Sequence, residues 1–206
     1  MEELIVTKAK ELFFSYGIKS VSMDDISRKG AISKKTIYKC FEDKNQLIER
    51  LVSELLSRFK SDLERSSKQG QNAIEELTLA SQTTINSISA ISPAFFYDLK
   101  KFFPGLWQLV EEHSHTVLIP SIANNLKKGI NEGLYREDLD IAFTTNIRIQ
   151  QITSVVGVDR VISRVSESHE LMLKLTQFYL HAIATARGKQ LINNYLNGNN
   201  DKEFSN

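Results

Sequence analysis

The sequence is short of the residues that cross-link or interrupt a chain. It contains one cysteine, which excludes an internal disulfide and is typical of a protein from a reducing compartment. Only three prolines and nine glycines occur in 206 residues, and alternating runs of β-branched residues are few. This composition favours an all-α fold. A hydrophobic fraction of 41% and a charged fraction of 25% are those of an ordinary globular protein.

Long apolar runs are also absent, since no stretch approaches the roughly 20 apolar residues that span a bilayer. The start of the chain, Met1 to Leu4, is acidic and lacks the basic region of a signal peptide. We therefore expect a cytoplasmic protein that does not insert into membranes. The net charge is only +1, but the charge is unevenly distributed. Residues 1–60 hold 12 basic and 9 acidic side chains, whereas the remainder holds 14 and 16.

Basic side chains gather in residues 28–41, which hold five of them and no acidic one. The pattern around this segment predicts two short helices joined by a tight turn. Ser22 and Asp25 form a capping pair that starts the first helix, and Gly30 ends it in the left-handed conformation that glycine adopts without steric penalty. Ser33 then caps the second helix. The residues expected to share one interior are Ile26, Ile32, Ile37 and Phe41.

The second helix of this pair should direct its polar side outward. The exposed residues are expected to be Lys34, Lys35, Thr36, Tyr38 and Lys39. A short, basic, hydroxyl-rich helix on a hydrophobic scaffold fits a DNA major groove. In the helix that follows, Asp43 is a good N-cap and Lys44 lies in the first turn, beside free backbone N–H groups. This position favours a phosphate contact by Lys44, with a solvated lysine as the alternative.

The order and spacing of residues over about thirty positions resemble the DNA-binding motif of the TetR family of bacterial transcriptional regulators. The matching residues are Gly17, Ser22, Asp25, Ile26, Gly30, Ala31, Ile32, Ser33, Lys34, Thr36, Ile37, Tyr38, Phe41, Lys44 and Leu47. The resemblance implies a three-helix DNA-binding domain over residues 1–46 and a helical ligand-binding and dimerisation domain over residues 47–196. We expect about nine helices in all and a disordered tail over residues 197–206. The residues then expected to contact DNA are Ser22, Ser33, Lys34, Lys35, Thr36, Tyr38, Lys39 and Lys44.

Helical periodicity continues through the rest of the chain. A first helix is expected over residues 2–16, where it braces the reading helix and its N-terminal end could alternatively touch the DNA backbone. A long helix over residues 43–66 should link the two domains, with residues 66–70 as its terminating loop. Further helices are expected over residues 71–92, 107–132 with a bend at Pro120, 139–156, and 168–187 with an end at Gly188. Residues 158–165 show no pattern that assigns them. A second match to the family lies over residues 129–140.

Six aromatic rings lie between Phe95 and Trp107, and Pro104 interrupts the helical pattern among them. One interpretation is a well-packed core, and the other is the wall of a ligand cavity among short, broken helices. The residues expected to line such a cavity are Phe95, Phe96, Phe103, Trp107, Val110, Ile147 and Gln151. They predict a largely apolar ligand whose orientation Gln151 helps to fix.

Other chemistries find little support in the sequence. His113 and His115 would point to different sides of a helix, and no zinc, phosphate-loop or serine-nucleophile motif occurs. We therefore expect no catalytic, metal or cofactor site. Cys40 has basic neighbours that could activate its thiol, but an inert, half-buried thiol is the alternative.

The sequence thus predicts a homodimeric, ligand-responsive DNA-binding regulator. Repression of an operator, relieved by an unknown small-molecule inducer, is what the family resemblance implies, and activation is the less common mode. The last two long helices, near residues 139–156 and 168–187, are the expected dimer interface. The rival interpretations are an all-α enzyme and a module whose helix-turn-helix binds protein.

Overall fold

The computed structural model describes residues 1–88, 90–156 and 165–203, and these residues confirm the all-α prediction. The helices are α1 (Glu2–Tyr16), α2 (Met23–Gly30), α3 (Lys34–Cys40), α4 (Lys44–Gln69), α5 (Ala73–Ile88), α6 (Pro93–Phe102), α7 (Pro104–His113), the π-helical segment η1 (Ser114–Leu118), α8 (Ile119–Asn131), α9 (Ile141–Val156), α10 (Val165–Ile183) and α11 (Ala186–Glu203). Within the described ranges, the only strand-like feature is an isolated bridge between Tyr135 and Ala184. None of the described helices is long and apolar enough to span a bilayer.

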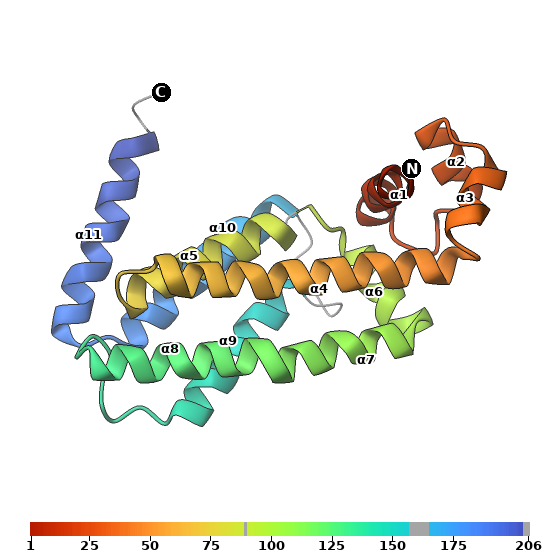
Figure 1. Cartoon of the computed structure of the whole chain (residues 1–206). Coiled ribbons are helices and arrows are strands. Elements are labelled where there is room, and N and C mark those ends of the chain that lie inside the picture. The colour runs from red at the N-terminus through yellow and green to blue at the C-terminus, as the bar shows by residue number, and fades with distance from the viewer. Residues whose placement is uncertain (89, 157–164, 204–206) are drawn as a thin grey trace.

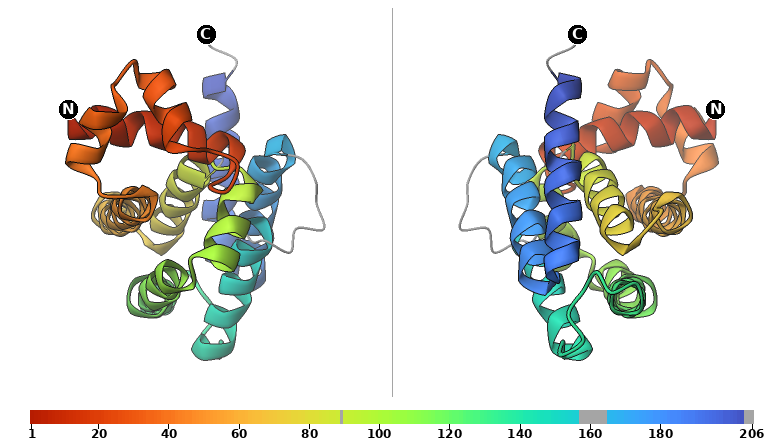
Figure 2. Two further views of the ribbon diagram at one scale, coloured as in Figure 1. Left: turned by 90° about the vertical axis from the view of Figure 1, so that its right-hand side faces the viewer. Right: turned by 90° about the vertical axis from the view of Figure 1, so that its left-hand side faces the viewer.

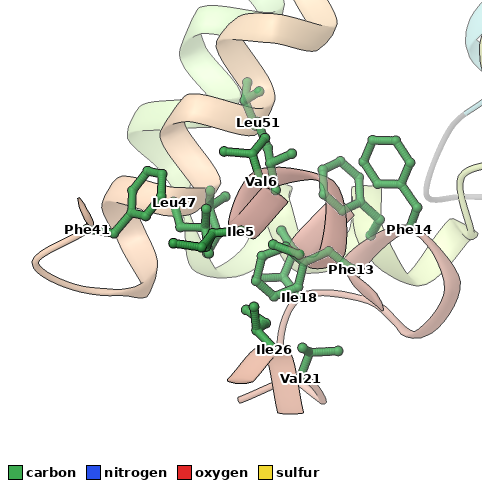
Figure 3. Close-up of a cluster of buried hydrophobic side chains, with 14 of the residues drawn as sticks. Ile5, Val6, Phe13, Phe14, Ile18, Val21, Ile26, Phe41, Leu47 and Leu51 are labelled. Atoms are coloured by element: carbon green, nitrogen blue, oxygen red, sulfur yellow. The ribbon is translucent and has the colours of Figure 1, made fainter. Parts of the chain in front are cut away.

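Helices α1, α2 and α3 form an N-terminal head at one end of the molecule (Figure 1). Ile5 and Phe13 of α1, Ile26 of α2 and Ile37 of α3 are fully buried in its interior together with Leu47 of α4. Figure 3 shows Ile5, Phe13, Ile26 and Leu47 of this cluster, which come from α1, α2 and α4. The predicted interior residues Ile26, Ile32, Ile37 and Phe41 all lie in this cluster.

Capping hydrogen bonds fix where α2 and α3 begin. The Ser22 hydroxyl accepts from the backbone N–H of Asp25, and the Asp25 carboxylate accepts from the N–H of Ser22, so the predicted capping box is confirmed. These bonds from Ser22 lower the pKa of Asp25 to about 2. The cap therefore stabilises the head above the ordinary carboxyl pKa of 3.8 and is lost as the pH falls toward 2. Ser33 likewise accepts from the N–H of Thr36.

The turn between α2 and α3 corrects one detail of the sequence prediction. Gly30 is the last residue of α2, and the left-handed residue is Ala31, with φ of 50° and ψ of 37°. Glycine at position 30 has a different role, because a Cβ there would lie 2.8 Å from the Cδ1 of Ile32. Gly30 thus lets Ile32 pack against the turn.

Helix α4 runs from the head along the body of the molecule, which consists of α5 to α11 (Figure 1). The Asp43 carboxylate caps it by accepting from the N–H of Gln46, as predicted. The helix continues to Gln69 and so extends through residues predicted to form its terminating loop. With 26 residues it is about 39 Å long.

The body is a bundle in which α5 packs against α4, α8 and α10, and α9 packs against α8 and α10. Figure 2 shows these helices from the two ends of the bundle. Pro93 and Pro104 begin α6 and α7, where a missing N–H costs nothing. The predicted distortion near Pro120 is the π-helical segment Ser114–Leu118, whose wider turn accommodates the proline that follows. Asp140 caps α9 by accepting from the N–H of Phe143.

The C-terminal helices differ from the sequence prediction in two respects. The break lies at Ala184–Thr185, where Ala184 bridges to Tyr135, rather than at Gly188. Gly188 lies inside α11, and a glycine is favoured there because a Cβ would come within 2.2 Å of the Leu134 carbonyl oxygen. The chain remains helical to Glu203, where the sequence predicts a disordered tail. Residues 157–164, including most of the unassigned connection, lie outside the described residues.

Candidate nucleic-acid interface and ligand cavity

Helix α3 presents a basic, solvent-exposed surface. Ile37 anchors the helix in the core of the head, and Lys34, Lys35 and Lys39 are exposed on the outside. Tyr38 is also exposed, with half of its surface accessible, and Thr36 is half-buried. A backbone held by buried isoleucines with lysines and a tyrosine outside is the arrangement that can enter a major groove.

Several of the candidate DNA contacts are engaged within the protein, among them Lys34, Ser22 and Ser33. The Nζ of Lys34 lies 2.6 Å from the Oδ2 of Asp24 on α2, in an ion pair that both partners expose to solvent. Such exposed pairs contribute little and exchange readily for a phosphate or a base edge. Asp24 was not foreseen as a partner from the sequence. The Ser22 hydroxyl forms the N-terminal cap of α2, so Ser22 has a structural role.

Lys44 has an environment that differs from the one predicted. Its ammonium donates to the carbonyl oxygens of Ile18 and Val21 and lies 5.5 Å from the centre of the Phe13 ring. Burial, followed by the charge of Lys19, lowers the pKa of this ammonium. The side chain thus fastens the α1–α2 connection to the start of α4. The Lys44 ammonium is thus occupied within the head, and its expected phosphate contact stays a prediction.

The aromatic segment of α6 and α7 joins the head to the body. Phe95 is fully buried, and its ring packs edge-on against Phe14 of α1 with centroids 5.0 Å apart. The N–H of Ser92 donates to the carbonyl oxygen of Phe14, and the Asp98 carboxylate accepts from the N–H of Lys19 at 2.6 Å. Helix α6 is therefore clamped onto the end of α1 and the connection that follows it.

The structure contains a small cavity at a place other than the one the sequence predicts. A cavity of about 40 Å³ lies among α4, α5, α8, α9 and α10. Its lining residues are Leu63, Glu76, Leu77, Ala80, Ser81, Thr84, Leu118, Ser121, Ile122, Asn125, Arg148, Ile152 and Met172.

None of the seven predicted pocket residues is in this lining. Phe95 and Phe96 are buried in the core shared with the head, and Phe103, Trp107 and Val110 pack against that core. Ile147 is 41% exposed on the outer side of α9, and Gln151 is half-buried next to Arg148. The aromatic cluster therefore packs as core in this structure, and its role as the wall of a ligand pocket stays a prediction.

Arg148 is the functional candidate that sequence reasoning missed. It is 2% exposed and lines the cavity. A signal was present in the sequence, because Arg148 is the one charged residue in the sixteen residues of α9. A single charged side chain in a helix whose other polar residues are all neutral is notable, since burying a charge is costly.

Cys40 is half-buried and packs against the core of the head, which supports the inert interpretation of its thiol. Among the described residues, no group of three or more His, Cys, Asp and Glu side chains is placed to hold a metal ion.

Comparisons with known proteins agree with this geometry. The family model described as bacterial regulatory proteins, tetR family, matches residues 5–51. No curated protein matches the sequence. The structure of the ketosteroid transcriptional regulator KstR2 of Mycobacterium tuberculosis aligns with a TM-score of 0.66 and 16% identity, over 89% of this chain and 95% of that one.

Two further solved structures are similar. The fatty acid degradation regulator FadR from Bacillus halodurans aligns with a TM-score of 0.67 and 15% identity, over 87% of this chain and 94% of that one. SCO4454, a TetR-family regulator from Streptomyces coelicolor, aligns with a TM-score of 0.69 and 14% identity, over 90% and 91% of the two chains. The family model thus identifies the head as a tetR-family regulatory domain, and the solved structures show that the chain shares the fold of these regulators over most of its length.

Proposed function

We propose that the protein is a sequence-specific, operator-binding repressor that a small molecule releases from DNA. The observation that carries this proposal is the exposed basic surface of α3, held on the buried scaffold of the head. We assign to DNA the side chains of Lys35, Tyr38 and Lys39. They do not make the intramolecular hydrogen bonds that occupy Ser22 and Lys44. Operator DNA lies in the bacterial cytoplasm, so the proposal places the protein there.

We propose further that two chains form a homodimer through α9 and α10. Phe143 and Ile147 of α9 are 63% and 41% exposed, and Phe178 of α10 is 69% exposed. Large apolar side chains exposed together on two packed helices are typical of a protein–protein interface. A dimer also supplies two reading helices, which specific DNA affinity generally requires.

The switch is proposed to act through α4 and α6. Helix α4 begins at Lys44, which holds the α1–α2 connection, and reaches the cavity at Leu63. Helix α5, which contributes Leu77 and Ser81 to the cavity, leads directly to α6 and its clamp on the head. A ligand that favours one arrangement of these helices would change the separation of the two reading helices in the dimer.

The DNA contacts can be tested with a labelled operator duplex and fluorescence anisotropy at several salt concentrations. Lys35→Ala and Lys39→Ala should each weaken binding severalfold, and a lost phosphate contact should reduce the salt slope by about one. Lys127→Ala is the matched control, because Lys127 is exposed on α8, far from the head (Figure 1). If both head variants kept the affinity and salt slope of the Lys127→Ala protein, α3 would not be the DNA-binding surface.

A further inference from the structure

Arg148 is a buried cation without a counter-ion among the described residues. Its Nη2 donates to the hydroxyls of Ser81 on α5 and Thr176 on α10, both at 2.9 Å, and its Nη1 donates to the Oε1 of Gln151 at 3.2 Å. Its Nε is buried and has no hydrogen-bond partner. All three partners are neutral, so the protein solvates the guanidinium without neutralising it.

The one acidic side chain that lines the cavity is already neutralised. Glu76 is buried and accepts from the Nζ of the half-buried Lys128 at 2.8 Å. Tyr179 contributes its ring face, with the guanidinium carbon 5.3 Å from the ring centre. The cavity wall near Arg148 therefore carries one uncompensated positive charge among polar and aromatic neighbours.

The fold does not depend on Arg148 to satisfy these neighbours. The Ser81 hydroxyl donates to the carbonyl oxygen of Leu77, and the Thr176 hydroxyl donates to that of Met172. Both hydroxyls would keep a partner if Arg148 were removed. Burial lowers the pKa of Arg148 to about 10, so the side chain stays protonated at neutral pH and its desolvation opposes folding. A structural role alone does not account for a cation at this place.

The remaining cavity lining is mainly aliphatic. Leu63, Leu77 and Ile122 come from α4, α5 and α8, and Ile152 and Met172 come from α9 and α10. The thioether of Met172 is flexible enough to adapt to an entering group. A guest that satisfies both parts of the cavity needs an apolar body and a single anionic end.

We propose that the cavity binds a small monocarboxylate with an apolar body, and that the Arg148 guanidinium holds its carboxylate. The planar fork of N–H donors on arginine matches the two oxygens of a carboxylate. One buried cation selects a monoanion over a polyanion. The assignment rests on the proposed ligand-responsive function, for which it names the class of effector. A bound carboxylate would compete with Ser81 and Thr176 for Nη2, and this competition would alter how α9 is tied to α5 and α10.

The test compares each acid with its matched alcohol, using isothermal titration calorimetry at pH 7 without DNA. The probes are butyrate, hexanoate, octanoate and phenylacetate, and their partners are 1-butanol, 1-hexanol, 1-octanol and 2-phenylethanol. At least one acid should bind the wild-type protein more tightly than its alcohol. Arg148→Met should weaken that acid about ten- to hundredfold, as expected for lost hydrogen bonds to a charged group. The same substitution should leave alcohol binding unchanged.

Two controls separate a binding role from a structural one. Arg148→Lys keeps a cation and should retain most of the preference for the acid. Arg136→Met removes an exposed arginine and should behave as wild type. The proposal is overturned if no acid binds better than its alcohol, or if Arg148→Met keeps the acid preference. The calorimetric test contains no DNA, so its outcome is independent of operator binding. A protein that fails to bind an operator would refute the proposed function but not the carboxylate site. A protein that binds an operator but shows no preference for an acid would refute the carboxylate site alone.

Discussion

Phe178→Glu should convert the protein into a monomer and abolish tight operator binding. Phe178 is the most exposed large apolar side chain of α10, and a dimer through α9 and α10 would bury it. The carboxylate introduced at position 178 would then be buried in the dimer interface without a partner, which is costly. Loss of the second reading helix removes the gain from two linked contacts, so operator affinity should fall about 10²- to 10⁴-fold. Analytical ultracentrifugation and anisotropy with an operator duplex measure the two effects.

Gln177→Glu is the matched control for the dimer. Gln177 is exposed on the same helix, and the substitution introduces the same charge one residue away, on a different side of α10. This variant should sediment as a dimer and bind the operator normally. A dimeric Phe178→Glu protein with full operator affinity would show that subunits associate through another surface.

Gly17→Ala should strongly destabilise the head. Gly17 has φ of 83° and ψ of 167°, a region that is essentially restricted to glycine. An added Cβ would lie 2.9 Å from the Oδ2 of Asp98 and 3.0 Å from the Cβ of Ala94. The methyl group would therefore wedge between α1 and α6 while the backbone is strained. We expect a loss of about 3 kcal/mol or more in the free energy of unfolding, measured by urea denaturation.

Gly105→Ala supplies the comparison for this prediction. No heavy atom lies within 4 Å of a Cβ at Gly105, and its backbone lies in α7 without a positive φ. Alanine there should be neutral or stabilise the protein by about 0.5–1 kcal/mol, because glycine is a poor helix former. A Gly17→Ala protein as stable as Gly105→Ala would mean that the joint between head and body tolerates rearrangement.

The head could be predicted largely from the sequence because its signals are local. Ser22 with Asp25, and Ser33 with Thr36, are three residues apart and form their caps within one turn. One error concerns Gly188, which resembles a helix end in the sequence but lies inside α11, where the Leu134 backbone approaches closely. A close approach depends on tertiary packing, which a local pattern does not reveal.

The cavity could not be predicted in the same way. Its wall is assembled from α4, α5, α8, α9 and α10, so the lining residues are scattered over more than a hundred positions of the chain. The aromatic segment drew attention because large rings suit both cores and pockets. Packing against Phe14 and the clamp from Asp98 to the N–H of Lys19 assign it to the joint between head and body. Arg148 was the available clue, because it is the one charged residue of α9.

The most direct test of the account is selection of bound duplexes from a pool of random DNA by the full-length protein. A dimer with one α3 per subunit predicts enrichment of an inverted repeat. The centres of its half-sites should be about one helical turn apart, or a multiple of that distance. Lys39→Ala protein should enrich the same repeat more weakly. Recovery of no common sequence, or of a single motif without its inverted copy, would contradict a dimeric, operator-reading regulator.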